Sequence, residues 1–130
     1  MINGALKAPL FSGRSKNEIG LIAVEGRLNQ LGFTTIRKPR NGLPPFLFVE
    51  FKDGSRRKVH YKYSAEYDNF RMPNINDISA NDLLGLFLES EDCVKIIEGL
   101  EVINKWKPVG DDGNLFFHEL DESPCVCPLD

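Results

Sequence analysis

The sequence holds few of the residues that build disulfide scaffolds, and it has no stretch suited to crossing a membrane. Its 130 residues include three cysteines and one tryptophan, and an odd number of cysteines cannot be fully paired within one chain. No apolar run approaches the roughly 20 residues of a membrane-spanning helix, and the first residues lack the apolar core of a secretory signal. We therefore expect a soluble protein in a reducing, cytoplasmic setting.

Several catalytic signatures are missing as well. The chain has no glycine-rich phosphate loop, no G-x-S-x-G elbow and no suitable order of Ser, His and Asp for a hydrolase triad. Cys125 and Cys127 are closer than the C-x₂-C spacing of structural zinc sites. A flexible tail over residues 121–130 is therefore favoured over zinc binding there.

The charges are unevenly distributed. The net charge is −3, yet residues 1–71 hold 13 Lys and Arg against 6 Asp and Glu, whereas residues 72–130 hold 3 against 13. A basic half is suited to phosphate groups and an acidic half to a basic partner. Plain solvated surface would show the same imbalance, so both interpretations remain open at this point.

The first regular element is a helix with a capping box. Ser15 and Glu18 have the S-x-x-E spacing in which the two residues cap the first turn reciprocally. Gly32 is placed to end the helix in a left-handed conformation, with Phe33 packing back on it. An apolar stripe at helical spacing lies between them: Leu21, Val24, Leu28 and Leu31.

Three strands are predicted next. A β-branched run at Thr34–Arg37 is followed by Lys38–Pro45, whose three prolines predict a loop. Phe46–Lys52 and Arg57–Tyr63 form the two strands of a hairpin, with Asp53–Gly54 as the turn signal.

The second half is predicted to be mainly helical. We expect a loop at Ser64–Asp77, helices beginning at Ser79 and Ser90, and a last strand at Leu115–Leu120. This order predicts an α+β (layered α/β) domain over residues 1–120, in which a mixed sheet of about four strands packs on helices.

The first half of the chain resembles a nuclease core. The stretch NEIGLIAVEGRLNQLGFTTIRKP, a proline-rich loop and PPFLFVEFKDGSRRKVHYKYS resemble the PD-(D/E)XK superfamily, which includes Holliday-junction resolvases and restriction endonucleases. The resemblance covers about Asn17–Ser64. It implies a restriction-endonuclease-like core that binds nucleic acid, DNA in preference to RNA, in defence, recombination or mobile-element biology.

The resemblance is incomplete at the metal site. Glu18 falls near the family's helix Glu, and Lys62 falls on its motif Lys. His60 falls on the Glu or Gln position, and Phe46 on that of the metal-binding Asp. Mg²⁺ requires oxygen ligands, so Phe46 removes one, and the imidazole of His60 is better suited to Mn²⁺ or Zn²⁺.

Glu50 is a candidate replacement, depending on the hairpin register. If Lys52 pairs with Arg57, Glu50 and His60 face opposite sides of the sheet. If the connection is one residue longer, Glu50 lies opposite His60. A metal-dependent phosphodiesterase using Mg²⁺ or Mn²⁺ would then have Glu50 and Glu18 as ligands. Its candidate catalytic residues are Lys62, Glu50, His60 and Glu18. Otherwise Glu18 only caps the helix, and Lys62 and His60 form a solvated strand face.

Cations and aromatic residues favour nucleic-acid binding even without chemistry, because cations bind phosphates and aromatic rings stack on unpaired bases. The candidate residues are Arg37, Lys38, Arg40, Arg56, Arg57, Lys58, Tyr63 and Tyr67. The prediction is therefore a nuclease-like, nucleic-acid-binding domain with a lost or relocated metal site.

A protein-interaction inhibitor is the alternative function. Its acidic helical half would dock on a basic partner and block a nucleic-acid-binding protein. The acidic residues concerned are Asp82, Glu89, Glu91, Asp92, Glu98 and Glu101. The sequence leaves the oligomeric state open.

Overall fold

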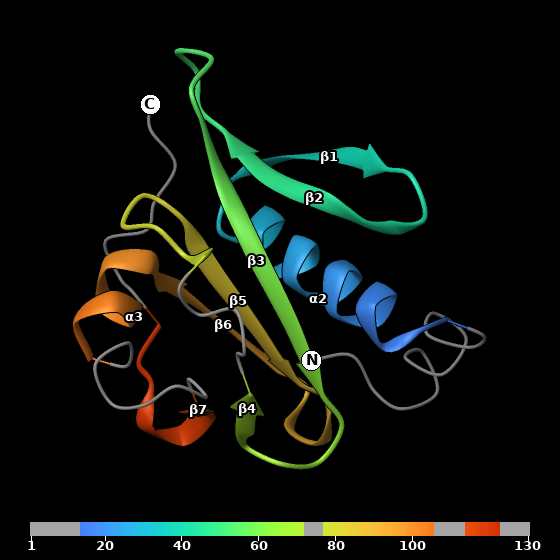
Figure 1. Cartoon of the computed structure of the whole chain (residues 1–130), viewed down its shortest axis with the longest axis vertical. Helices are drawn as coiled ribbons and strands as arrows, with labels where there is room; N and C mark the ends of the chain where they lie inside the picture. The colour runs from blue at the N-terminus through green and yellow to red at the C-terminus, as the bar shows by residue number, and fades with distance from the viewer. Residues whose placement is uncertain (1–13, 72–76, 106–113, 123–130) are drawn as a thin grey trace.

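A five-stranded mixed sheet carries the fold (Figure 1). The computed structural model describes residues 14–71, 77–105 and 114–122. Its helices and strands are α2 (Lys16–Gln30), β1 (Thr34–Arg40), β2 (Leu43–Glu50), β3 (Arg56–Ser64), β4 (Asn69–Arg71), β5 (Leu83–Leu88), β6 (Cys93–Glu98), α3 (Gly99–Lys105) and β7 (Asn114–Phe116). The sheet has the order β1-β2-β3-β5-β6, and β4 pairs with β7 separately. β3 and β5 are parallel and the other pairs are antiparallel. The α+β class is confirmed, with five strands in the main sheet.

Helix α2 has the predicted caps. The Ser15 side chain accepts a hydrogen bond from the Glu18 backbone, and the Glu18 carboxylate accepts one from the Ser15 backbone. At the other end Gly32 has a φ of 95°. The Phe33 amide donates to the Leu28 carbonyl at 3.0 Å, which is the backbone pattern of a Schellman cap.

The sheet is covered unequally on its two faces. α2 packs across one face and contacts all five strands, burying a core that includes Leu47, Val49 and Val59. On the other face α3, β4, β7 and the 3₁₀ turn Phe117–Glu119 cover β5 and β6, where a second core forms around Leu84 and its neighbours. Within the described ranges no helix covers this second face over β1, β2 and β3, and β4 makes contacts with β3. We call that part the open face.

The prediction of helices in the second half is wrong for two segments, which form strands. Leu83–Leu88 forms β5 and Cys93–Glu98 forms β6, whereas Gly99–Lys105 forms the helix α3. All six residues of β5 are buried, because one face of the strand packs under α2 and the other in the second core. The predicted loop Ser64–Asp77 contains β4. The predicted last strand is reduced to the end of β7 followed by a 3₁₀ turn.

The proline-rich segment is also paired, contrary to the prediction of a loop. β1 extends to Arg40 and β2 begins at Leu43, so only Asn41–Gly42 forms the turn, with a φ of 70° at Gly42. Pro39 lies where the β1–β2 register shifts, between Lys38 and Arg40. A bulge of this kind and an edge position are where sheets tolerate proline.

The register of the β2–β3 hairpin differs from both predicted registers. Glu50 pairs with Arg56, and Leu47 pairs with Val59. Even-numbered side chains of both strands therefore share the open face, because the side chains of a strand alternate.

The C-terminal described segment is fastened to β6. Lys95 Nζ donates to the carbonyls of Phe117 and Leu120, each at 2.7 Å. The Glu122 carboxylate accepts from the Ile96 amide at 3.2 Å and forms an ion pair with Arg27 at 2.6 Å. The predicted tail 121–130 lies outside the described residues from 123 onward. No described helix combines the length and the apolarity needed to span a bilayer.

Candidate nucleic-acid interface

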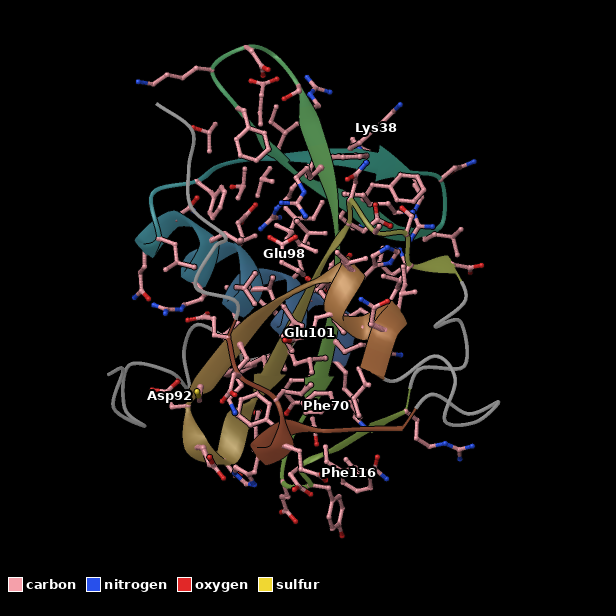
Figure 2. All side chains as sticks on the ribbon, turned by 90° about the vertical axis from the view of Figure 1, so that its left-hand side faces the viewer. Lys38, Phe70, Asp92, Glu98, Glu101 and Phe116 are labelled. Carbon is pink, nitrogen blue, oxygen red and sulfur yellow. The ribbon has the colours of Figure 1, made fainter. Side chains whose placement is uncertain are left out.

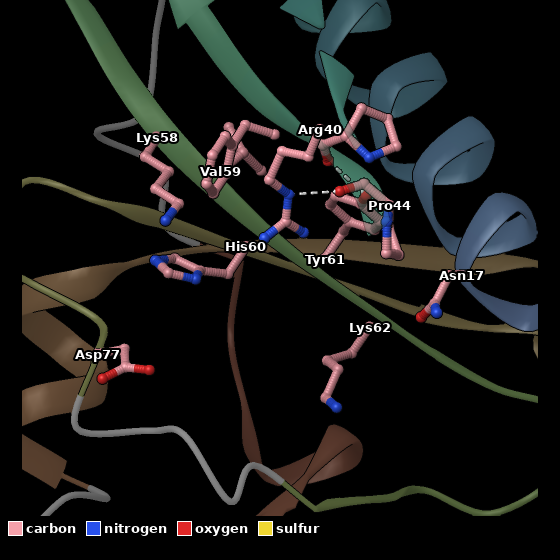
Figure 3. Close-up of a pocket in the computed structure, with 11 residues that line it drawn as sticks. Asn17, Arg40, Pro44, Lys58, Val59, His60, Tyr61, Lys62 and Asp77 are labelled. Carbon is pink, nitrogen blue, oxygen red and sulfur yellow. Dashed lines mark hydrogen bonds between the residues drawn. The ribbon is translucent and has the colours of Figure 1, made fainter. Parts of the chain in front are cut away.

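A cleft opens where β2 and β3 separate. Their pairing ends at Leu47 and Val59. Beyond that point β2 continues beside β1 only and β3 beside β5 only. The resulting hollow has a volume of about 310 Å³ (Figure 3). Its lining residues are Asn17, Arg40, Pro44, Pro45, Phe46, Lys58, Val59, His60, Tyr61, Lys62 and Asp77.

Phe46 organises two cations at this cleft. The guanidinium carbon of Arg40 lies 4.2 Å from the centre of the Phe46 ring, and Lys58 Nζ lies 4.4 Å from it. Arg40 Nε also donates to the Pro44 carbonyl at 2.6 Å. A ring attracts cations through its quadrupole, so Phe46 holds the positive charges of Arg40 and Lys58 together at this cleft.

The open face is basic. Lys38 is exposed on β1, and Figure 2 shows it at one end of the molecule, with Phe70 and Phe116 toward the other. Lys62 lines the cleft from β3. Within the described residues, no carboxylate forms an ion pair with Lys38, Lys58 or Lys62. Among the residues that the structure describes, Asp77 is the one acidic residue that lines the cleft.

His60 is tied to the segment that precedes β5. Its Nε2 lies 2.8 Å from Asp82 Oδ2, and the same carboxylate oxygen accepts from the Ser79 amide at 3.0 Å. Burial alone would raise the pKa of Asp82, but the hydrogen bonds from His60 and Ser79 outweigh it and lower that pKa. An ionised Asp82 thus orients the His60 ring at the wall of the cleft.

Two predicted phosphate-binding residues lie on the opposite face. Arg37 forms an ion pair with Glu25 of α2 at 2.7 Å, and Arg57 forms one with Glu98 of β6 at 2.5 Å. Both occupy odd positions and point to the α2 side of the sheet. They hold the helix and the far strand to the sheet, so the basic segments seen in the sequence divide between the two faces.

The predicted tyrosines lie beyond the cleft at the end of β3. The hydroxyl of Tyr63 donates to Glu89, whereas Tyr67 is 75% exposed in the following turn. Burial, followed by the hydrogen bond to Glu89 and the charge of that residue, raises the pKa of Tyr63 to about 12.

Tyr63 is therefore expected to ionise near pH 12 in the folded protein, against about 10 for a tyrosine in an unfolded chain. Its stabilising contribution is intact below about pH 10 and is lost as the pH rises toward 12, because the unfolded state releases the proton first. Tyrosinate absorbance during alkaline titration measures this, with Tyr63→Phe to assign the step. Loss of a step near pH 10 in that variant would contradict the assignment.

The predicted metal and catalytic residues do not assemble into one site. Glu18 is used in the helix cap, and Glu50 forms an ion pair with Arg56 at 3.0 Å. Glu50 lies opposite Arg56, which precedes His60 by four residues, a separation of about 13 Å along a strand. Only His60 and Lys62 meet in the cleft.

The described residues accordingly do not fit Mg²⁺ or Mn²⁺. Within residues 14–71, 77–105 and 114–122 no group of three His, Cys, Asp or Glu side chains is placed to hold a metal ion. Hard cations need several oxygen ligands converging on one point, and the carboxylates nearest the hairpin face other partners.

The acidic residues of the second half are not arranged as one helical surface. Asp82 contacts His60, Glu98 contacts Arg57, and Glu91 lies 2.6 Å from a ring nitrogen of His118. Glu89 accepts from Tyr63. These contacts leave less uncompensated negative charge for a basic partner than the composition indicates.

The sequence did not indicate the cleft itself. The Asn41–Gly42 pair is a strong hairpin signal. A hairpin predicted there would have placed Arg40 near Phe46 on the neighbouring strand. In comparisons with models of protein families, with curated proteins and with solved structures, the chain has no significant match.

Proposed function

We propose that this chain binds nucleic acid through the cleft and the open face, without metal-dependent chemistry at that site. The observation that supports this most is the grouping of Arg40, Lys58 and Lys62 around one hollow, with Lys38 on the same side of the sheet. Cations held together on one face bind the phosphate backbone and release its counterions.

We further propose that residues 17–64 form a nuclease-like core that has lost its metal ligands and binds DNA. The order of α2, β1, β2 and β3 agrees with the elements that the resemblance implies for residues 17–64. With Phe46 at the Asp position, the core keeps a phosphate-binding surface and lacks the metal ligands. DNA is the ligand that the resemblance favours, so DNA and RNA of one sequence should be compared directly.

Removing one cation from the cleft should weaken nucleic-acid binding. We expect Lys58→Ala and Lys62→Ala each to reduce affinity about three- to tenfold at low salt, and to lower the salt slope of binding by about one unit. Lys52→Ala is the matched control, because Lys52 is exposed in the β2–β3 turn and lies outside the cleft. Fluorescence anisotropy with labelled DNA and RNA over a salt series measures both quantities.

Two kinds of result would contradict the proposed function. Absence of binding to any nucleic acid at low salt, or equal losses for Lys52→Ala and the cleft variants, would remove the cleft as the binding site. Cleavage that depends on Mg²⁺ or Mn²⁺ in the wild type would remove the claim that the metal chemistry is lost.

A further inference from the structure

A second hollow adjoins the cleft beside the start of β2. It has a volume of about 320 Å³ and shares Asn17, Pro44 and Pro45 with the cleft. Its apolar wall includes Leu21 and Leu43, and Leu43 is 60% exposed. An exposed apolar side chain therefore lies beside a group of cations. A nucleotide has matching parts, since its base is apolar and its phosphate is anionic.

We propose that the two hollows together hold one unpaired nucleotide, with its phosphate among Arg40, Lys58 and Lys62 and its base against Leu43 and Pro44. This rests on the proposed function and narrows it to single-stranded nucleic acid. Asn17 lines both hollows, and its amide can donate and accept hydrogen bonds at the edge of a base.

The size of the hollows favours a single nucleotide over a duplex. Each volume is near the lower end of the roughly 300–1,000 Å³ of small-molecule sites. A base in a duplex is paired and stacked, and moving it into such a site costs a few kcal/mol. An unpaired base in a single strand does not have to be separated from a partner. We therefore expect the same cations to bind a single strand more tightly than a duplex.

The aromatic residues nearby do not offer a better place for the base. The Phe46 ring already carries Arg40 and Lys58 over it. The Tyr61 hydroxyl donates to the Pro45 carbonyl at 2.7 Å, and burial raises its pKa. Because the rings of Phe46 and Tyr61 already have other contacts, we place the base against the exposed apolar surface of Leu43.

The test compares single-stranded and duplex oligonucleotides of one sequence with the full chain. We expect Leu43→Asn, which removes the apolar surface without adding charge, to weaken single-strand binding about five- to tenfold, within the range known for losing a base contact, and to leave duplex binding unchanged. Leu100→Asn is the matched control, since Leu100 is 53% exposed on α3 and lies outside both hollows. Thermal melting of both variants confirms that they fold.

Each outcome decides the inference. Preference for the single strand, competition by nucleoside monophosphates and selective loss of single-strand binding in Leu43→Asn support it. Duplex binding as tight as single-strand binding, with equal affinities for Leu43→Asn and Leu100→Asn, overturns the inference and leaves the proposed function standing. Absence of binding to either form overturns both.

Discussion

Replacing Phe46 with Asp is expected to weaken nucleic-acid binding through the proposed cleft by about tenfold or more, although the resemblance to PD-(D/E)XK nucleases would place an Asp at this position. The new carboxylate would stand where the ring now lies 4.2 Å from the Arg40 guanidinium and 4.4 Å from Lys58 Nζ. It would pair with those cations and repel phosphate. Each tenfold loss corresponds to about 1.4 kcal/mol, which is modest for introducing a negative charge into the proposed phosphate site.

The same variant should not gain nuclease activity. A metal ion would still have fewer oxygen ligands than a hard cation needs, since Asp77 alone among the described carboxylates lines the cleft, whereas Glu50 is paired with Arg56 and Glu18 caps α2. Titration of labelled DNA measures the affinity, and incubation with Mg²⁺ or Mn²⁺ measures cleavage.

Phe46→Leu is the control for lost ring contacts. It keeps apolar bulk and removes only the cation–π attraction, worth about 0.5–1 kcal/mol at an exposed site, so its affinity should fall only about two- to fivefold. Unchanged or tighter binding in Phe46→Asp, or metal-dependent cleavage by it, would contradict this assignment of Phe46.

Replacing Gly99 with Ala is expected to destabilise the fold by about 3 kcal/mol, the upper part of the usual range for overpacking. Gly99 begins α3, and its amide donates to the Asp82 carbonyl at 2.7 Å. A β-carbon there would lie 2.8 Å from that carbonyl oxygen and would also overlap the Ser79 carbonyl oxygen. Backbone oxygens cannot rotate away as a side chain can, so the turn that carries Asp82 must move.

Gly26→Ala is the matched control, with the opposite expected sign. Gly26 lies within α2, and a β-carbon added to it would meet no atom within 4 Å, so the change should stabilise the helix by about 0.5–1 kcal/mol. Urea or thermal unfolding of the two variants measures both effects. Similar stabilities would show that the contact at Gly99 is not constrained.

The parts of the fold that could be predicted are those with local signals. The capping box at Ser15 and the glycine stop at Gly32 define α2, because caps act within a few residues of the chain. Asp53–Gly54 likewise marks the β2–β3 hairpin. The register could not be predicted, since alternation fixes which residues share a face and leaves the length of the connection open.

The second half was misassigned because its signal depends on tertiary packing. Leu83–Leu88 is apolar throughout, and a short continuous run of this kind does not distinguish a buried strand from a helix. The site has the same difficulty. Arg57 and Lys58 are neighbours in the sequence, and only the distant partner Glu98 shows that one is structural and the other faces the cleft.

The pairing of β4 with β7 determines when the second core can close during synthesis. Phe70 pairs with Leu115, and Leu115, Phe117 and Leu120 belong to the second core, so the apolar side of β5 is only partly covered until residues 114–120 have left the ribosome. The core under α2 needs nothing beyond Ile96 and can form earlier. Exposed apolar strands are prone to aggregate before their cover arrives. We therefore expect nascent chains that end between these two points to be the ones that chaperones bind.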